Sequence, residues 1–204
     1  CKHGRDKMEA YLDNAATTRA SESVRAIVSE ALETNYGNPS SMHRKGIEAE
    51  KYIKETKDII AKTLKVEPKE IVFTSGGTES NNMALIGTAL ANKRAGNHII
   101  TTRFEHPSVY NPLLMLEEFG FRISFIDVDV NGQINLQQLL EQICEDTILV
   151  SVMYVNNEIG SILDIAGISR AIKNKKPGIL LHVDAIQAFG KLKIYPKREG
   201  IDLM

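Results

Sequence analysis

The sequence contains no tryptophan, only two cysteines and almost no net charge. Cys1 and Cys144 are far apart and form neither a disulfide framework nor a metal-binding motif, so a reducing cytoplasm is the simplest compartment. The formal charge of −1 gives no electrostatic reason to expect nucleic acid or an anionic membrane as a partner. No apolar run approaches the roughly 18 residues of a membrane span, and nothing resembles a signal peptide. A globular protein without a membrane segment is therefore expected.

The 204 residues are enough for one sizeable core. Residues 1–10 are expected to be a tag remnant or a disordered start, because Met8 stands just before the first ordered-looking segment. For Cys1 and His3 a disordered terminus is favoured over a metal site. Residues 11–204 contain no interdomain linker or internal repeat. No two His, Cys or carboxylate residues show metal-ligand spacing on one element, so no metal site is predicted.

Hydrophobic periodicity predicts two helices followed by an alternation of strands and helices. Residues 21–36 and 46–64 both carry apolar side chains at helical spacing. The later predicted strands are 70–75, 97–102, 121–128, 147–155 and 178–184, and the predicted helices between them are 78–93, 107–120, 135–146 and 164–175. This alternation predicts an α/β fold with a mostly parallel sheet and helices on both faces. Ligands of such sheets bind beyond the carboxyl ends of the strands.

The first predicted strand is followed by "GGTESNN". Two glycines let the backbone turn closely, and Thr78 then opens a helix whose free N–H groups and dipole favour an anion such as phosphate. The alternative is an ordinary capped helix start, with Ser75 or Thr78 as the cap and Glu79 in the first turn. The segment matches neither a GxGxxG nor a Walker A sequence.

Polar residues also follow the next strands of the predicted sheet. His106 stands directly before Pro107, where it could stack on a flat ring, act as a base, or be a polar loop residue. "NNEIG" follows the strand at 147–155, and an amide there suits a phenolic or carboxylate oxygen, although asparagines are also common in loops.

The stretch "HVDAIQ" places Asp184 at the end of an apolar strand, with Gln187 three residues on. A buried carboxylate is costly unless a positive or hydrogen-bonding group meets it. His182, on the same strand, is more simply a core histidine. A phosphorylated, flat, cationic heterocycle would satisfy a phosphate cradle, a stacking ring, an amide and Asp184 together. Pyridoxal 5'-phosphate (PLP) is such a molecule, and an Asp is the usual partner of its pyridinium.

Several motifs together resemble the cysteine desulfurases of the NifS/IscS type, in the class V aminotransferase superfamily of PLP-dependent enzymes. The motifs are "YLDNAATT", "YGNPSSMHRKG", "EIVFTSGGTESNN", "EH", "VNNEIG" and "HVDAIQAFGK". The resemblance runs in register from about Tyr11 to Met204. It implies most of the large, PLP-binding domain of a fold-type I, aspartate aminotransferase-like transferase.

The resemblance also implies the roles of individual residues. The implied cofactor-binding residues are Gly77 and Thr78 at the phosphate, His106 stacked on the pyridine ring, Asn157 and Gln187 at the phenolic oxygen, and Asp184 at the pyridinium nitrogen. His106 and Asp184 are also the implied catalytic residues. Asn157 is implied near the substrate carboxylate, and Ala15 and Ala16 on the substrate side.

The activity that the resemblance implies is the conversion of L-cysteine to L-alanine, with the sulfur passed to an enzyme cysteine for iron–sulfur cluster or thio-cofactor biosynthesis. Such enzymes are homodimers that serve a sulfur acceptor or scaffold protein. The Schiff-base lysine, the persulfide cysteine and a small carboxyl-terminal domain match no part of the chain, which stops at Met204. We therefore expect a fragment that is inactive alone. Cys144 matches no catalytic position and is expected to be a buried thiol.

Other interpretations compete with a desulfurase. Selenocysteine lyase or another class V enzyme is the nearest, because substrate choice depends largely on sequence outside the chain. A non-catalytic, truncated dimerisation or binding module is an alternative of another class, since a partial large domain exposes apolar surface. A dinucleotide-binding domain lacks its glycine fingerprint here.

Overall fold

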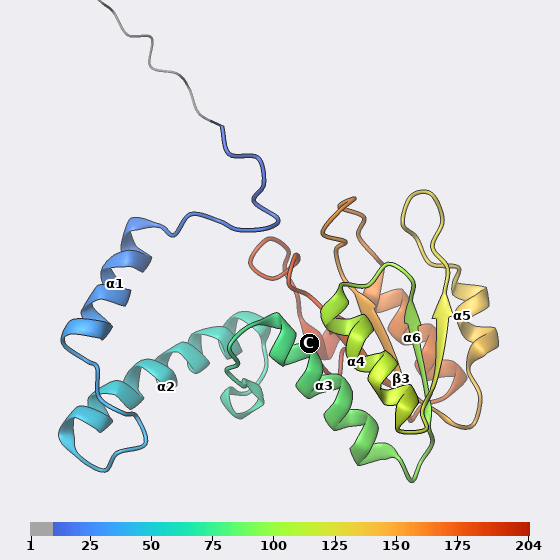
Figure 1. Ribbon diagram of the computed structural model, residues 1–204, viewed down its shortest axis with the longest axis horizontal. Helices are drawn as coiled ribbons and strands as arrows, with labels where there is room; N and C mark the ends of the chain where they lie inside the picture. The colour runs from blue at the N-terminus through green and yellow to red at the C-terminus, as the bar shows by residue number, and fades with distance from the viewer. Residues whose placement is uncertain (1–9) are drawn as a thin grey trace, which may run out of the picture. The chain divides into compact units, whose positions relative to one another are not determined.

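The computed structural model describes residues 10–204 (Figure 1). The expectation for the first ten residues, including Cys1, His3 and Met8, falls outside this range except at Ala10. The chain divides into two compact units, residues 1–53 and 54–204, and each is described by itself.

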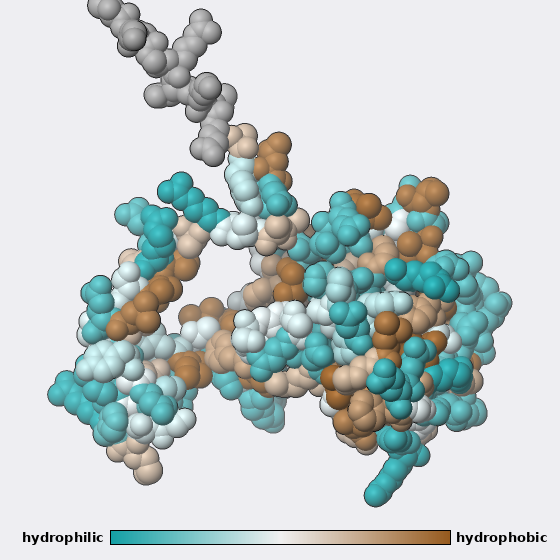
Figure 2. Space-filling model, viewed as in Figure 1, coloured by the Kyte–Doolittle hydropathy of each residue, from teal (hydrophilic) through white to brown (hydrophobic). Residues whose placement is uncertain are grey.

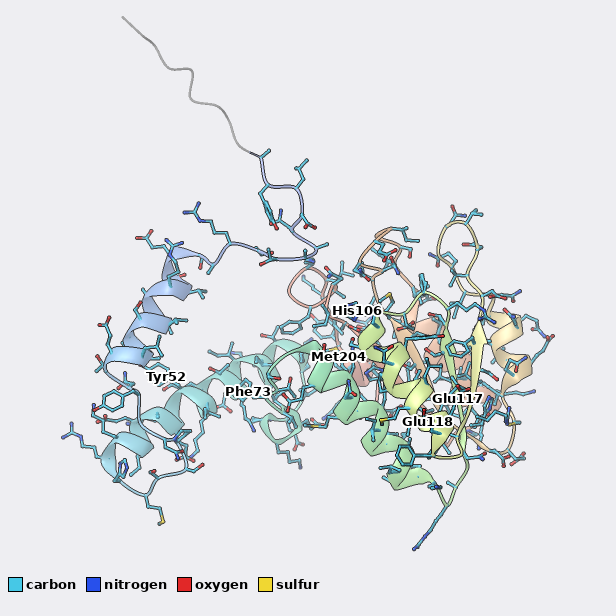
Figure 3. All side chains as sticks on the ribbon, in the orientation of Figure 1. Tyr52, Phe73, His106, Glu117, Glu118 and Met204 are labelled. Atoms are coloured by element: carbon cyan, nitrogen blue, oxygen red, sulfur yellow. The ribbon has the colours of Figure 1, made fainter. Side chains whose placement is uncertain are left out.

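The first unit contains α1 (Glu22–Glu33) and the beginning of α2 (Arg44–Leu64). The Ser21 hydroxyl caps α1 by accepting a hydrogen bond from the Val24 N–H, so the helix predicted from residue 21 is confirmed with a shorter end. None of its residues is buried, and its apolar side chains form a brown stripe in Figure 2. Tyr52, labelled in Figure 3, donates its hydroxyl to Glu30 and accepts from Asn35.

The second unit is built on a sheet of four parallel strands in the order β2-β1-β3-β4. The strands are β1 (His98–Thr102), β2 (Arg122–Ile126), β3 (Thr147–Met153) and β4 (Leu180–Asp184). Every residue of β1 and β3 is buried, as expected for the middle of a sheet covered on both faces. The predicted α/β class is thereby confirmed.

Two pairs of helices cover opposite faces of this sheet. The pairs are α3 (Gly77–Asn92) with α4 (Pro107–Glu118), and α5 (Leu136–Gln142) with α6 (Ile165–Lys175). Side chains alternate along a strand, so neighbouring residues enter different cores. Ile99 packs in the core under α3 and α4, and Ile100 packs in the core under α5 and α6. A short helix, α7 (Pro196–Glu199), follows β4.

The strand predicted at residues 70–75 is not formed. A 3-10 turn, η1 (Pro68–Glu70), stands at its beginning, and the residues that follow are assigned to no strand. Val72 and Phe73 are 64% and 48% exposed; Phe73 is labelled in Figure 3. A β-branched run becomes a strand only when a neighbour takes up its backbone hydrogen bonds, and no strand in residues 10–204 pairs with this segment.

Candidate functional site

The polar residues predicted at the strand ends meet at the carboxyl edge of the sheet. The register pairs Met153, at the end of β3, with Asp184, at the end of β4. The Tyr154 N–H then donates to the Asp184 carbonyl at 2.9 Å, and this bond keeps the ends of β3 and β4 side by side. The chain segments that leave β1, β3 and β4 therefore start from one edge, as expected for parallel strands.

The start of α3 presents backbone N–H groups without a side-chain cap. Its N-cap is Gly76, which has no side-chain oxygen, so the alternative with Ser75 or Thr78 as the cap is wrong. The Glu79 carboxylate instead accepts a hydrogen bond from the Ser75 N–H, and hydrogen bonds from Ser75 lower the pKa of Glu79. A Cβ at Gly77 would lie 2.7 Å from the Cδ1 of Ile186, so the start of α3 lies close to the loop after β4, and a side chain at this position would displace the exposed Ile186 side chain.

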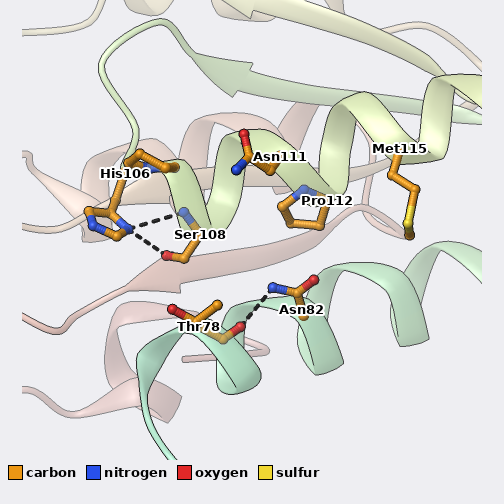
Figure 4. A pocket seen from close by; sticks show the side chains of 8 residues that line it. Thr78, Asn82, His106, Ser108, Asn111, Pro112 and Met115 are labelled. Carbon is orange, nitrogen blue, oxygen red and sulfur yellow. Dashed lines mark hydrogen bonds between the residues drawn. The ribbon is translucent and has the colours of Figure 1, made fainter.

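His106 is the N-cap of α4, directly before Pro107 in the first turn. Its Nδ1 accepts a hydrogen bond from the Ser108 N–H at 3.1 Å and lies 2.8 Å from the Ser108 Oγ. The imidazole lies beside a pocket of about 410 Å³ between α3 and α4, which extends along α4 as far as Met115 (Figure 4). Thr78 also lines this pocket, so the structure brings these two predicted residues together.

Asp184 is buried, with 6% of its surface exposed. Its Oδ2 accepts a hydrogen bond from the Asn81 amide at 2.9 Å, and its Oδ1 accepts one from the Ile186 N–H at 3.0 Å. These bonds offset part of the cost of burial. A carboxylate has about four acceptor positions, so two bonds leave capacity for a further donor.

The two adjacent asparagines after β3 differ in role. Asn156 is buried, and its Oδ1 accepts from the N–H groups of Glu158 and Ile159, so it shapes the turn. Asn157 is half-buried beside it. Gln187 is also half-buried, and its Oε1 accepts from the Lys191 ammonium at 3.0 Å. The cofactor contacts of Asn157 and Gln187 stay predictions.

Glu105 lies beneath the site and was assigned no role in the sequence. Its Oε1 accepts hydrogen bonds from the Thr102 hydroxyl at 2.6 Å and the Met153 N–H at 2.9 Å, whereas its buried Oε2 has no partner in residues 10–204. Burial raises the pKa of Glu105 to about 8, against the lowering effect of these two hydrogen bonds. Glu105 is therefore mainly protonated at neutral pH.

Ala15 and Ala16 lie in a turn of the first unit, where the Ala16 N–H donates to the Asp13 carbonyl at 3.3 Å. Their contact with substrate stays a prediction.

Two residues outside the proposed site were also interpreted from the sequence. His182 is fully buried, as predicted for a core histidine, and its Nδ1 lies 2.9 Å from the Ser151 hydroxyl, but its Nε2 has no hydrogen-bond partner in residues 10–204, so the expectation of a fully hydrogen-bonded core histidine is wrong. Cys144, expected to be buried, is exposed, because α5 ends at Gln142 and the residue that then enters the core is Ile143. Burial would raise the pKa of the Cys144 thiol, but hydrogen bonds from Thr147 and Arg122 outweigh it, so the pKa is lowered.

Sequence reasoning missed Asn81 and Ser108. Asn81 is 4% exposed and lies on the same buried face of α3 as Leu85 and Thr88. The available signal was the spacing: Asn81 is followed at i+4 by Leu85 and at i+7 by Thr88, so it lies on the buried face of the helix. A buried amide needs hydrogen-bond partners.

In the described part of the chain, residues 10–204, no helix is long and apolar enough to cross a membrane, and no three His, Cys, Asp or Glu side chains are grouped to hold a metal ion.

The sequence matches the family pattern described as "Aminotransferase class-V" over residues 10–204. It is 45% identical over 194 residues to "Putative cysteine desulfurase IscS 1" of Bacillus subtilis, covering 95% of this chain and 51% of that protein. It is 43% identical over 201 residues to "Cysteine desulfurase IscS" of Pseudoalteromonas translucida, covering 97% and 49%. The chain thus spans about half the length of these relatives.

Solved structures give the same picture. A "NIFS-LIKE PROTEIN" superposes with a TM-score of 0.92 at 38% identity, covering 96% of this chain and 53% of that one. The structure described as "SspA in complex with cysteine" superposes with a TM-score of 0.89 at 36% identity, covering 94% and 55%. The fold seen here is therefore that of NifS-like proteins over about half their length.

Proposed function

The chain belongs to the class-V aminotransferase family, and on that premise we propose that the carboxyl edge of its sheet is the PLP site of a cysteine desulfurase. The observation that carries the proposal is the buried Asp184, whose two hydrogen bonds leave acceptor capacity at the edge where ligands of parallel sheets bind.

The residues present fit this cofactor. The uncapped start of α3, with Gly77 held against Ile186 and Thr78 in the first turn, suits a phosphate. The exposed His106 ring, at the edge of the pocket with Thr78, suits stacking on a flat heterocycle. The Asp184 carboxylate suits a protonated ring nitrogen. Asn157 and Gln187 are amides near the same edge and would serve the phenolic oxygen.

The bound PLP supplies an electron sink for a carbanion at the substrate α-carbon. The role of Asp184 is to keep the ring nitrogen protonated, because a carboxylate beside a cationic nitrogen favours its charged form. His106 orients the ring by contact with its face. The protonated Glu105 lies behind this edge and adds no second negative charge beside Asp184 at neutral pH.

The substrate proposed for the whole protein is L-cysteine, with release of L-alanine. The names of the relatives and the neighbour described in complex with cysteine support it. We further propose a cytoplasmic homodimer that passes sulfur to an acceptor or scaffold protein. No lysine of the chain matches the Schiff-base position, so these 204 residues alone are expected not to complete the reaction.

The test uses the chain together with any sequence that its gene encodes beyond Met204. The protein is incubated with PLP and either L-cysteine or L-selenocysteine, and L-alanine is measured. The expected result is alanine from L-cysteine, with the sulfur held as a persulfide and released as sulfide when a thiol reductant such as dithiothreitol is added. Alanine from L-selenocysteine alone would identify a selenocysteine lyase. Binding of PLP without any alanine would reject the reaction and favour a non-catalytic module.

A further inference from the structure

A chain of hydrogen bonds joins His106 to Asp184 through two buried residues, Asn81 and Ser108. The His106 Nδ1 lies 2.8 Å from the Ser108 Oγ, and the Ser108 Oγ accepts from the Asn81 amide at 2.9 Å. The same amide donates to the Asp184 Oδ2 at 2.9 Å. Asn81 and Ser108 are 4% and 8% exposed, so water competes little for these bonds. The chain links three elements, α4, α3 and β4.

The direction of each bond follows from the donors available. The Asn81 amide has two N–H groups, and both have acceptors, the Ser108 Oγ and the Asp184 Oδ2. The Ser108 oxygen is then an acceptor, and its own hydrogen is free to point at the His106 Nδ1. The Ser108 backbone N–H donates to the same nitrogen. Because a backbone N–H can only donate, Nδ1 is an acceptor and the proton of the neutral ring lies on Nε2.

We propose that Asn81 and Ser108 are positioning residues, which fix the tautomer of His106 and the orientation of the Asp184 carboxylate as one unit. The meaning of this unit for catalysis rests on the proposed function. His106 is predicted to contact the face of the flat ring, and Asp184 its nitrogen. The Asn81 amide connects these two groups, directly to Asp184 and through Ser108 to His106. The Nε2–H of His106 is directed away from the helix start, where a substrate or cofactor can meet it.

A packing role alone makes a different prediction. Asn81 shares its helix face with Leu85 and Thr88, and a leucine, which has the same number and branching of side-chain heavy atoms, would fill this position. If only packing matters, Asn81→Leu leaves the His106 ring unchanged. If the hydrogen-bond chain matters, Asn81→Leu removes both N–H donors and allows the Ser108 hydroxyl to turn away from Nδ1.

The test is the ¹⁵N spectrum of the His106 ring in cofactor-free protein, at a pH where the ring is neutral. The variants are Asn81→Leu, Ser108→Ala and the hydroxyl-retaining Ser108→Thr, and a His106→Gln variant assigns the signals. Asn92→Leu is the matched control, since the Asn92 amide lies on the same helix and, within residues 10–204, bonds to the Thr88 carbonyl and not to the site. The protein again includes any sequence encoded beyond Met204.

The Nε2–H form is expected to dominate in the parent, in Asn92→Leu and in Ser108→Thr. The ratio of the two tautomers should fall about fivefold in Asn81→Leu and in Ser108→Ala, the effect of one ordinary hydrogen bond. The double variant should fall no further than either single variant, because the bonds act in series. Unchanged ratios in Asn81→Leu and Ser108→Ala would overturn the proposal. If Asn81→Leu fails to fold, Asn81→Ala, which removes the same two N–H donors, replaces it, and the Ser108→Ala and Ser108→Thr pair tests the bond to His106.

This result is independent of the proposed function, because no cofactor is present. A tautomer that depends on Asn81 in a protein that binds no PLP would uphold the hydrogen-bond unit and reject the PLP site. Normal alanine production with a tautomer independent of Asn81 and Ser108 would do the reverse.

Discussion

Each end of the sheet has a histidine that bonds to hydroxyl groups, but the histidine is buried at the amino end and exposed at the carboxyl end. At the amino end, the ring nitrogens of His98 lie 2.8 Å from the Thr147 hydroxyl and 2.9 Å from the Ser124 hydroxyl. At the carboxyl end, His106 bonds to Ser108 through Nδ1 while its ring remains exposed. Burial lowers the pKa of His98 to about 4, so the amino-end histidine stays neutral.

This difference shows how to separate a structural polar cluster from a functional one. Hydrogen bonds at the amino end satisfy both nitrogens of His98 and need nothing else. At the carboxyl end, the helix start lacks a cap, Asp184 keeps acceptor capacity, and a pocket opens beside His106. Groups that bind a ligand keep part of their hydrogen-bonding capacity unused by the protein.

The largest effect on activity is expected at Asp184. In the complete protein, Asp184→Ala should lower the rate of alanine formation by about 100-fold or more, equivalent to roughly 3 kcal/mol, because the ring nitrogen loses its partner. Some PLP binding should persist through the phosphate contacts. The measurement is alanine production with saturating PLP. A rate close to that of the parent would show that Asp184 has no role in the reaction, and would reject the assignment of the carboxyl end of the sheet as the functional end.

The second prediction concerns the free energy of unfolding, which should depend on pH through Glu105. The pKa of Glu105 is raised from 4.5 to about 8, so the native state binds more protons than the unfolded state between these values. The free energy of unfolding therefore falls as the pH rises through this window. Glu105→Gln should raise the free energy of unfolding by up to about 4 kcal/mol above pH 8, and the gain should vanish near pH 4.5.

Urea unfolding of parent and Glu105→Gln at pH 5, 7 and 8.5 checks this expectation. A difference that is the same at all three pH values would mean that Glu105 is ionised in the native protein at neutral pH.

A smaller effect is expected at His106. Removing the ring in His106→Ala should weaken PLP binding about fivefold to tenfold, the range for one aromatic contact, and should shift the visible absorption of the bound cofactor. Titration with PLP, followed by absorbance, measures both. An unchanged spectrum would reject stacking by His106.

The smallest effect is expected at the amino end. Cys144→Ser should leave PLP affinity and alanine formation within about twofold of the parent, since its partners, Arg122 and Thr147, belong to the structural end of the sheet. The exposed thiol, with its lowered pKa, should react readily with iodoacetamide in the parent. Loss of activity in Cys144→Ser would show that this end is not purely structural.

Sequence patterns predicted the parts of this structure that depend on local signals. β1, β3 and β4 follow from their apolar runs, and α4 begins at Pro107 as expected. The predicted strand at 70–75 failed because strand formation needs a partner, which is a non-local property. The burial of Cys144 failed because it depended on where α5 ends.

The site shows the same division. His106 and Asp184 could be found from their positions after apolar runs, because parallel strands bring their ends together. The helix face of Asn81 offered a signal that its amide is buried, but its partners could not be predicted, since they lie 27 and 103 residues away in sequence. Only the packing of α3 against α4 and β4 shows that one amide joins them.

The proposed PLP site depends above all on the pairing of Asp184 with the nitrogen of a pyridinium ring. The direct measurement is the ¹⁵N signal of ring-labelled PLP bound to the complete protein and to its Asp184→Asn variant. We predict a protonated ring nitrogen in the parent at pH 8 and an unprotonated one in the variant. An unprotonated nitrogen in the parent, or the same signal in both proteins, would contradict the claim.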